Sequence, residues 1–303
     1  MTDTATTSPA EATADGAQAP GRPFVIRNLP FLIVHLGVFA AFWTGVSWPA
    51  IVVCLGLYWM RVFFVTGFYH RYFSHRTYQT SRLFQFVMAF LGTTALQKGP
   101  LWWSGHHRYH HRHSDDEFDV HSPKNRGFWW AHVGWLIDIE RNDTRWEEIK
   151  DLARFKELRF FEKNYRLGIL AFLGGVIGLG FWIERSFPST GATWTQVFVW
   201  GGVVGTVLLW HTTYLINSGA HMWGSRRYST SDTSRNNFFL AIVTMGEGWH
   251  NNHHRYPGAE RNGFFWYEID VTHYLLTIMS WFGLIWDLRR PPSHVYEESA
   301  ETT

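Results

Sequence analysis

The chain has 303 residues, a formal net charge of +2 at pH 7 and 18% aromatic residues. So small a net charge argues against a nucleic-acid-binding surface spread over the whole protein. The single cysteine excludes an internal disulfide, a cysteine zinc site and an iron–sulfur cluster within this sequence, so any metal site here must use other ligands.

The N-terminal residues 1–23 are rich in Ala, Thr and Pro and contain almost no large apolar side chains. Such a composition cannot pack a core, so we expect a disordered tail. The stretch also lacks the basic and apolar regions of a secretory signal peptide. Residues 24–290 are expected to form one membrane domain, and residues 291–303 a flexible C-terminal tail.

Two apolar blocks each predict a pair of membrane-spanning helices. In the first block the spans are 29–46 and 49–69, and in the second they are 167–183 and 195–216. An α-helix rises about 1.5 Å per residue, so these segments approach the thickness of a bilayer. We therefore expect an all-α membrane protein with four transmembrane helices arranged as two hairpins.

Residues 70–166, between the hairpins, are rich in Lys and Arg, whereas the two short hairpin loops contribute only Arg185. The positive-inside rule then predicts that this segment and both termini are cytoplasmic. Residues 83–97 are apolar but too short to span, which suits a helix in the membrane interface. Residues 273–288 look similar, and a fifth span there would place the C-terminus outside.

Four histidine motifs fall on the predicted cytoplasmic side. They are HRYFSH with His70 and His75, HRYHH with His107, His110 and His111, NSGAH with His221, and HNNHH with His250, His253 and His254. On a helix, residues three and four apart share a face, so each HxxHH sets one ring a turn before two others. His70 and His75 lie about 140° apart on an ideal α-helix, so we expect that helix to end or unwind between them. Nine rings exceed one tetrahedral zinc site and suit two metals of four or five ligands each.

The other histidines are expected to have supporting roles. Packing or hydrogen bonding is expected for three of them, which are His35, His211 and His273. Positions around the metal ligands or at the surface are expected for four more, which are His106, His113, His121 and His132.

At this point the sequence resembles a known family. HRYFSH, HRYHH and GEGWHNNHH are similar to the three histidine boxes of the integral-membrane fatty-acyl desaturases. NSGAH and HSPKNRGFWWAHVGWLID resemble further segments of the Δ9, stearoyl-type branch, and the likeness covers roughly residues 50–270. The resemblance implies four transmembrane helices beneath a cytoplasmic cap that holds a di-iron centre.

Carried over residue by residue, the resemblance also implies the ligands. One iron would be held by His70, His75, His107, His111 and His253. The other would be held by His110, His221, His250 and His254, with Asn217 reaching it through water. The implied reaction uses O2 to remove hydrogen from two neighbouring methylenes of a saturated acyl chain. It leaves a cis double bond, expected at Δ9, in unsaturated fatty acid biosynthesis.

The implied reaction needs two electrons per turnover, but this sequence carries no nicotinamide or flavin fingerprint such as GxGxxG. We therefore expect an external donor, a ferredoxin or a cytochrome b5 type with its reductase. The acyl chain would lie in an apolar tunnel. Five tryptophans are candidates for its walls or for interface anchors, namely Trp102, Trp103, Trp129, Trp130 and Trp135.

Two other functions remain open from the sequence. A membrane hydroxylase or alkane monooxygenase uses similar histidine boxes but transfers oxygen to carbon. A metal transporter or storage protein would place charged residues within its spans, which here hold few. A zinc protease is disfavoured because no HExxH occurs.

The carrier of the acyl chain is the least determined feature. Acyl-CoA members of the family place an Arg-Asp pair before the second box and a basic pair after the HVGW segment, where cations suit the CoA phosphates. Here the corresponding pairs are Gly105-His106 and Ile139-Glu140, although Arg141 and Arg145 are nearby. The sequence therefore slightly favours an acyl-lipid over an acyl-CoA substrate.

Overall fold

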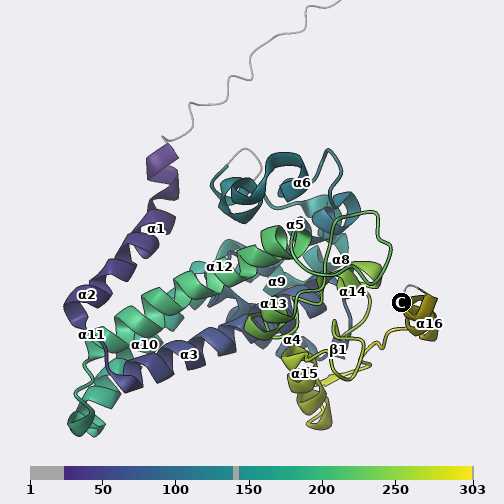
Figure 1. The fold of residues 1–303 in the computed structure, drawn as a ribbon. Coiled ribbons are helices and arrows are strands. Elements are labelled where there is room, and N and C mark those ends of the chain that lie inside the picture. Colours follow the sequence, from purple (N-terminus) through teal and green to yellow (C-terminus); the bar gives the residue numbers. More distant parts are fainter. Residues whose placement is uncertain (1–23, 139–142, 302–303) are drawn as a thin grey trace, which may run out of the picture.

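The computed structural model describes residues 24–138 and 143–301, so the tail predicted over 1–23 lies outside the described residues. Within these ranges the chain is mostly helical, with one short antiparallel ladder between β1 (Gln79–Thr80) and β2 (Ile285–Trp286). Long helices run side by side and end in a cap of short helices and loops (Figure 1).

Three helices are long and apolar enough to cross a membrane. They are Trp48–Ser74, Arg166–Ser186 and Trp194–His221, and they coincide with three of the four predicted spans. The first is α3 (Trp48–Phe63) continued by the π-helix η2 (Phe64–Ser74), and the second is α10 (Arg166–Ser186). The third joins α11 (Trp194–Val197), the π-helix η7 (Phe198–Val204), α12 (Gly205–Ser218) and η8 (Gly219–His221).

The predicted span over 29–46 is shorter than the others. It comprises α1 (Phe24–Gly37), η1 (Val38–Ala40) and α2 (Ala41–Thr44), and its apolar part, Asn28–Thr44, falls below the length of the three long helices. Gly45 ends it with a φ of 71°, a conformation that favours glycine. This helix flanks the bundle beside α12 and η7 (Figure 1).

A buried arginine ties the three long helices together. Arg61 of α3 is fully buried and donates from Nη1 to Thr206 Oγ1 of α12 at 2.7 Å. Its Nε donates to the Leu57 carbonyl at 3.2 Å, and its guanidinium lies 4.0 Å from the centre of the Phe172 ring of α10. Hydrogen bonds and the aromatic face together compensate for the burial of a cation among apolar side chains.

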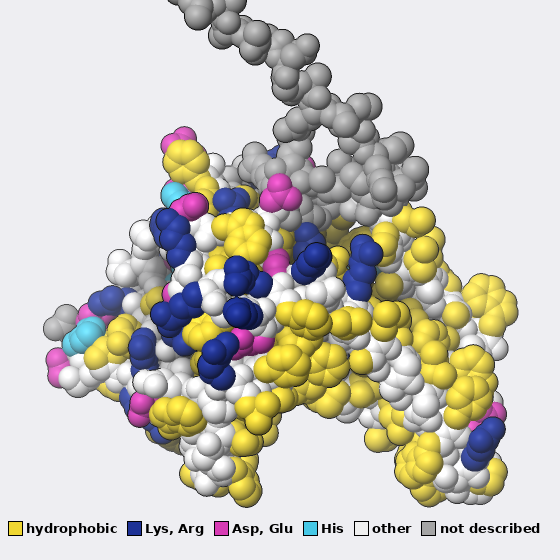
Figure 2. Space-filling view, turned by 180° about the vertical axis from the view of Figure 1, so that it is seen from behind, with side chains coloured by type: hydrophobic (Ala, Val, Ile, Leu, Met, Phe, Trp, Pro, Cys, Tyr) yellow, Lys and Arg dark blue, Asp and Glu magenta, His cyan; other side chains and the backbone are white. Residues whose placement is uncertain are grey.

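The cap is built from two parts of the chain. Its first part contains α4 (Arg82–Thr93), α5 (Pro100–His113), α6 (Pro123–Arg126), η3 (Trp130–Gly134), α7 (Trp135–Ile137), η5 (Trp146–Ile149), α8 (Lys150–Ala153) and α9 (Lys156–Lys163). Its second part contains α13 (Phe238–Val243), α14 (His250–Arg255), α15 (Val271–Trp281) and α16 (Ser293–Glu301). Lys and Arg gather over the cap, whereas hydrophobic side chains cover the bundle (Figure 2).

The N-terminus of α5, the helix that carries the second histidine motif, is fixed by a carboxylate. Glu162 of α9 accepts hydrogen bonds at Oε2 from the backbone N–H groups of Leu101 and Trp102, both at 3.0 Å. A carboxylate satisfies the free N–H groups of a helix start and complements its dipole. The position of α5, and so of its three histidines, is therefore set by α9.

The helix that carries the first histidine motif ends at Ser74, between His70 and His75, as expected. Before that end it widens into the π-helix η2, and the His75 N–H donates to the His70 carbonyl at 3.2 Å. Residues five apart are bonded neighbours in a π-helix. The wider turn therefore brings the two rings together, with their centres 4.9 Å apart.

Three further segments differ from their predicted extents. The apolar segment 83–97 folds as α4, which ends at Thr93. Within 273–288, α15 has only 11 residues and is followed by β2, so it is too short to be a fifth span. The C-terminal segment contains α16 where a flexible tail was expected, because Val295 is buried beside Tyr228 and Phe264 and Arg255 pairs with Glu298.

Gly248, two residues before the HNNHH motif, packs against the backbone of α13. A Cβ at this position would overlap the backbone N of Ala241, which cannot move without moving the helix. We expect Gly248→Ala to lower the free energy of unfolding by about 1–3 kcal/mol, seen as a lower melting temperature in detergent.

Gly175→Ala, on α10, is the matched control, because a Cβ at this position would have no neighbour within 4 Å. It should leave the melting temperature unchanged or raise it slightly. Equal melting temperatures for the two variants would contradict the tight packing of Gly248.

Candidate metal centre

Four segments bring the predicted histidines into one buried region at the junction of bundle and cap. η2 and its C-cap supply His70 and His75, and η8 supplies His221. The other six rings come from two short runs of helix. They are His107, His110 and His111 of α5 and His250, His253 and His254 of α14.

The nine rings form two groups, in each of which the nearest ring nitrogens lie within 4.8 Å of one another. The five-histidine group is His70, His75, His107, His111 and His253. The four-histidine group is His110, His221, His250 and His254. This is the division that the sequence resemblance implies, although the role of these residues as iron ligands stays a proposal.

Within each group the rings meet through their Nε2 atoms. In the five-histidine group, His253 Nε2 lies 3.0 Å from His70 Nε2 and 2.9 Å from His111 Nε2. In the four-histidine group, His221 Nε2 lies 3.1 Å from His250 Nε2. The Nε2 atom of His254 is buried without a hydrogen-bond partner. Nitrogen lone pairs that converge in this way fit bound metal ions.

Burial favours the neutral form that metal ligation requires in several of these rings, whereas in His110 the charge of Asp119 outweighs burial and raises the pKa. Burial, followed by the charge of neighbouring rings, lowers the pKa values of His107, His111 and His253 well below the usual value. Burial also lowers the pKa of His254 to about 4, although Asp232 opposes that shift. Neutral imidazoles of this kind suit iron, zinc, copper and nickel.

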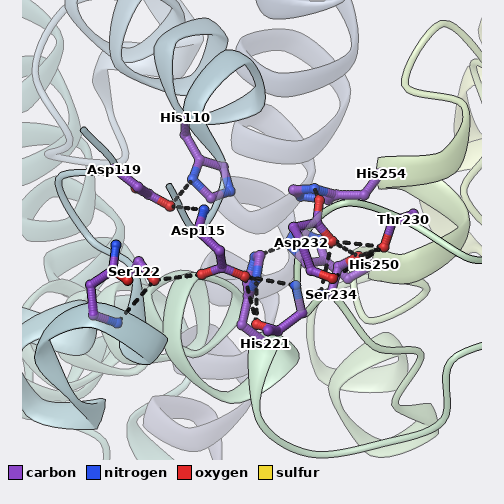
Figure 3. Close-up of polar contacts among 12 residues, drawn as sticks. His110, Asp115, Asp119, Ser122, His221, Thr230, Asp232, Ser234, His250 and His254 are labelled. Carbon is purple, nitrogen blue, oxygen red and sulfur yellow. Dashed lines mark hydrogen bonds and ion pairs between the residues drawn. The ribbon is translucent and has the colours of Figure 1, made fainter. Parts of the chain in front are cut away.

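Four carboxylates, none of which was identified from the sequence, contact the outer Nδ1 atoms of these rings. His110 Nδ1 lies 3.1 Å from Asp119, and His254 Nδ1 lies 2.5 Å from Asp232 (Figure 3). The other two pairs are His221 with Asp115 at 3.2 Å and His70 with Glu247 at 2.7 Å. A carboxylate that accepts the Nδ1 proton leaves Nε2 free for a metal.

An apolar cavity ends at the two groups. Its lining includes His70, His107, His110 and His250, and also Asn217 of α12. Asn217 thus faces the same space as ligands of both groups, and its predicted link to a metal through water stays a prediction. The remaining lining residues are mostly apolar or threonine side chains of α3, η2, α12 and the end of α13.

Of the five candidate tryptophans, Trp103 is the one that lines this cavity in the described structure. Its Nε1–H donates to Gln97 Oε1 at 3.0 Å, and Gln97 Nε2 donates to Thr213 Oγ1 at 3.1 Å across the cavity wall. The others lie elsewhere. Trp102 stacks on Trp135, Trp130 donates to the Val120 carbonyl, and Trp129 is 76% exposed.

Several other histidines are in contact with one another or with acidic groups. His211 connects His35, at 3.1 Å, to His132, at 2.9 Å, between α1, α12 and η3. His273 pairs with Glu260, and His121 lies 3.6 Å from Asp119. His113, near the surface, pairs with Asp116 at 2.8 Å.

His106 is buried and donates from Nε2 to the Asp143 carbonyl at 3.0 Å. It is therefore a structural residue beside the second motif.

Comparison with known proteins places these features in a family. Residues 46–277 match the family model described as fatty acid desaturase. The chain is 36% identical over 255 residues to the acyl-CoA C20 Δ5-desaturase of Anemone leveillei, which covers 81% of this chain and 75% of that relative.

Two further relatives act on lipid-bound chains by name. The sn-1 stearoyl-lipid 9-desaturase of Anabaena variabilis is 36% identical over 274 residues, covering 86% of this chain and 91% of the relative. The Delta-9 acyl-lipid desaturase 1 of Arabidopsis thaliana is 35% identical over 272 residues, covering 88% and 84%.

The convergence of the rings predicts the metal content of the protein. We expect the purified wild-type chain to bind two divalent transition-metal ions, and His253→Ala to lose one, because His253 contacts two other rings of its group. His35→Ala should retain both ions. The measurement is metal content per chain by mass spectrometry, and two ions bound at wild-type affinity in His253→Ala would refute the grouping.

The burial of His106 predicts an acid-sensitive stability. Burial, followed by the charge of Arg145, lowers its pKa from 6.5 to about 3. Between these pH values only the unfolded chain binds the proton, so stability falls as the pH falls from 6.5. When the pH is lowered from 7 to 5, the free energy of unfolding of the wild type should fall by about 2 kcal/mol more than that of His106→Gln, which lacks the titrating ring. Melting curves of the metal-free proteins at both pH values provide the measurement.

Proposed function

The chain belongs to the fatty acid desaturase family and is an oxidoreductase of fatty-acyl chains, and from this premise we propose that it is a di-iron acyl-lipid Δ9-desaturase. The observation that carries the proposal is the pair of histidine groups at the end of an apolar cavity. The relatives include both Δ5 and Δ9 enzymes, and the Δ9 assignment draws its support from the stearoyl-type motifs of the sequence.

The nine histidines are proposed as the iron ligands. The five-histidine group would hold one iron and the four-histidine group the other, with Asn217 beside them at the cavity. Two irons bound there would supply oxygen activation, the chemistry that removes hydrogen from an unactivated methylene. The fit is supported by the donor set, since the Nε2 atoms of these rings converge within each group.

The cavity is proposed to bind and orient the acyl chain. A saturated chain offers no polar handle near the reacting carbons, so its position must come from the shape of the walls. The hydrogen bonds from Trp103 to Gln97 and from Gln97 to Thr213 link two parts of that wall. The cavity has a volume of about 50 Å³ and opens to the outside.

We propose a multi-pass membrane protein with four spans, of which Asn28–Thr44 is the first, and with the cap and both termini in the cytoplasm. The three long apolar helices and the flanking helix beside α12 support the four spans. The cytoplasmic side is supported by the Lys and Arg side chains over the cap, in contrast to the single Arg185 in the hairpin loops (Figure 2).

Gly105 supports a lipid-bound substrate over a CoA ester. A Cβ at this position would lie 3.1 Å from the backbone oxygen of Arg145 and 3.3 Å from its Cβ. The long cationic side chain found here in acyl-CoA members would therefore meet the backbone of residue 145. Ile139-Glu140, the pair that stands where acyl-CoA members have a basic pair, and the neighbouring Arg141 lie outside the described residues.

The electrons are proposed to come from a separate protein, a reduced ferredoxin or a cytochrome b5 type with its reductase. The overall reaction consumes one O2, two electrons and two protons and yields two waters with the double bond. The single Cys54, which is buried, leaves this sequence without ligands for an iron–sulfur cluster.

The proposal predicts the outcome of a reconstitution. We expect the iron-loaded enzyme, in vesicles with a donor and its reductase, to convert labelled stearoyl phosphatidyl lipid to a product two hydrogens lighter, and to convert labelled stearoyl-CoA at least tenfold more slowly. Mass spectrometry also distinguishes desaturation from hydroxylation, which adds an oxygen, and locates the double bond.

Conditions that block acyl exchange keep the two substrates separate. His107→Ala should give no product, and omission of the donor should stop turnover by the wild type. Desaturation of the CoA ester alone would refute the lipid assignment, and an oxygenated product would refute desaturation itself.

A further inference from the structure

The two histidine groups differ in the carboxylates that support them. Three carboxylates contact rings of the four-histidine group, and one contacts a ring of the five-histidine group. We propose that Asp115, Asp119 and Asp232 are positioning residues that give the four-histidine group the higher metal affinity and the lower reduction potential of the two. This inference rests on the proposed di-iron function.

The three carboxylates come from two loops that close over one side of the site. Asp115 and Asp119 follow α5, whereas Asp232 lies between η8 and α13. Each is buried and points a carboxylate oxygen at an outer ring nitrogen (Figure 3). In each case the opposite nitrogen of the ring belongs to the four-histidine group, so these carboxylates act on the metal site through the rings.

Each carboxylate is itself held by neutral donors. Asp115 accepts from Ser122 Oγ at 2.5 Å and from the backbone N–H of Thr233 at 2.7 Å. Asp232 accepts from the backbone N–H of Ser234 at 3.0 Å. Asp119 likewise accepts from the backbone N–H of Asp115 at 2.9 Å.

Within the described residues, no Lys or Arg pairs with any of the three, so their negative charges are directed to the rings.

The five-histidine group has weaker support of this kind. Glu247 contacts His70, but its other oxygen lies 3.1 Å from Nη2 of Arg71. Arg71 in turn pairs with Asp270 at 2.9 Å. The charge of Glu247 is thus shared with a guanidinium. Among the described residues, no carboxylate lies within 4.0 Å of a ring nitrogen in the other four histidines of this group.

The physical consequence follows from ligand basicity and from charge. A carboxylate that accepts the Nδ1 proton fixes the ring orientation and increases the electron density at Nε2. Three such charges in a buried site also favour the more highly charged state of a bound metal, because buried charges are poorly screened. Both effects strengthen binding and lower the reduction potential. Counting rings alone predicts the reverse order of affinity, so the two explanations can be separated.

The test uses full-length protein loaded with 57Fe(II) and a matched pair of variants. With one iron per chain, the wild type should show one main Mössbauer doublet, from the four-histidine group, and with two irons a second doublet should appear. Asp232→Asn should lower the iron affinity of the four-histidine group by about 10–100-fold, so that the first doublet weakens while the second remains. Glu247→Gln should affect the second doublet and leave the first. Asp232→Glu, which keeps a carboxylate, should restore most of the affinity.

A redox titration provides the second measurement. In the wild type the four-histidine group should have the lower reduction potential, and in Asp232→Asn that potential should shift upward. Asp119→Asn serves as an independent variant if Asp232→Asn fails to fold, which melting of the metal-free protein would reveal. Unchanged affinity and potential in both Asp variants, or equal weakening of both doublets, would overturn the inference. A wild type that binds fewer than two irons would instead overturn the proposed di-iron function.

Discussion

The structure depends on holding nine imidazole rings close together and oriented inward in one buried region. Neighbouring protonated rings would repel one another, and each unpaired polar nitrogen in an apolar environment costs free energy. The chain meets this constraint on both sides of three rings, His110, His221 and His254. Within each group the Nε2 atoms face one another. On the outer side of some rings a carboxylate accepts the Nδ1 proton, as Asp232 does from His254. The apolar bundle and the cap exist in this arrangement to exclude water from that region.

The same constraint explains the irregular helices at the junction. A regular α-helix would direct His70 and His75 to different sides, and the π-helix η2 brings them to one side while preserving a backbone hydrogen bond between them. α5 and α14 need no such distortion, because the i, i+3, i+4 spacing of HxxHH already suits an α-helix. The N-terminus of α5 is fixed from outside by Glu162, so the ring positions follow from ordinary helix geometry once their starting points are set.

The sequence predicted the features that rest on short-range regularity. Hydropathy located three long helices closely, and histidine spacing identified the nine rings that the structure brings together. Features that depend on long-range contacts escaped it. Asp232 and Glu247 carry no local signature, since an aspartate in a polar loop looks the same whether it is solvated or paired with His254. The helix α16 depends on the contact of Val295 with residues far away in the sequence, and the widening of η2 has no residue pattern that marks it.

Arg61 has a consequence for how the chain is made. In the membrane proposed above, its guanidinium contacts Thr206 and Phe172, both of which are synthesised more than a hundred residues later. An arginine at the centre of an isolated helix costs about 2.5–3.5 kcal/mol during insertion. The remainder of α3, rich in Val, Leu, Ile and aromatic residues, must offset that cost while the ribosome is still translating the cap. Membrane insertion during synthesis therefore requires α3 to be hydrophobic, and this requirement is separate from any that catalysis imposes.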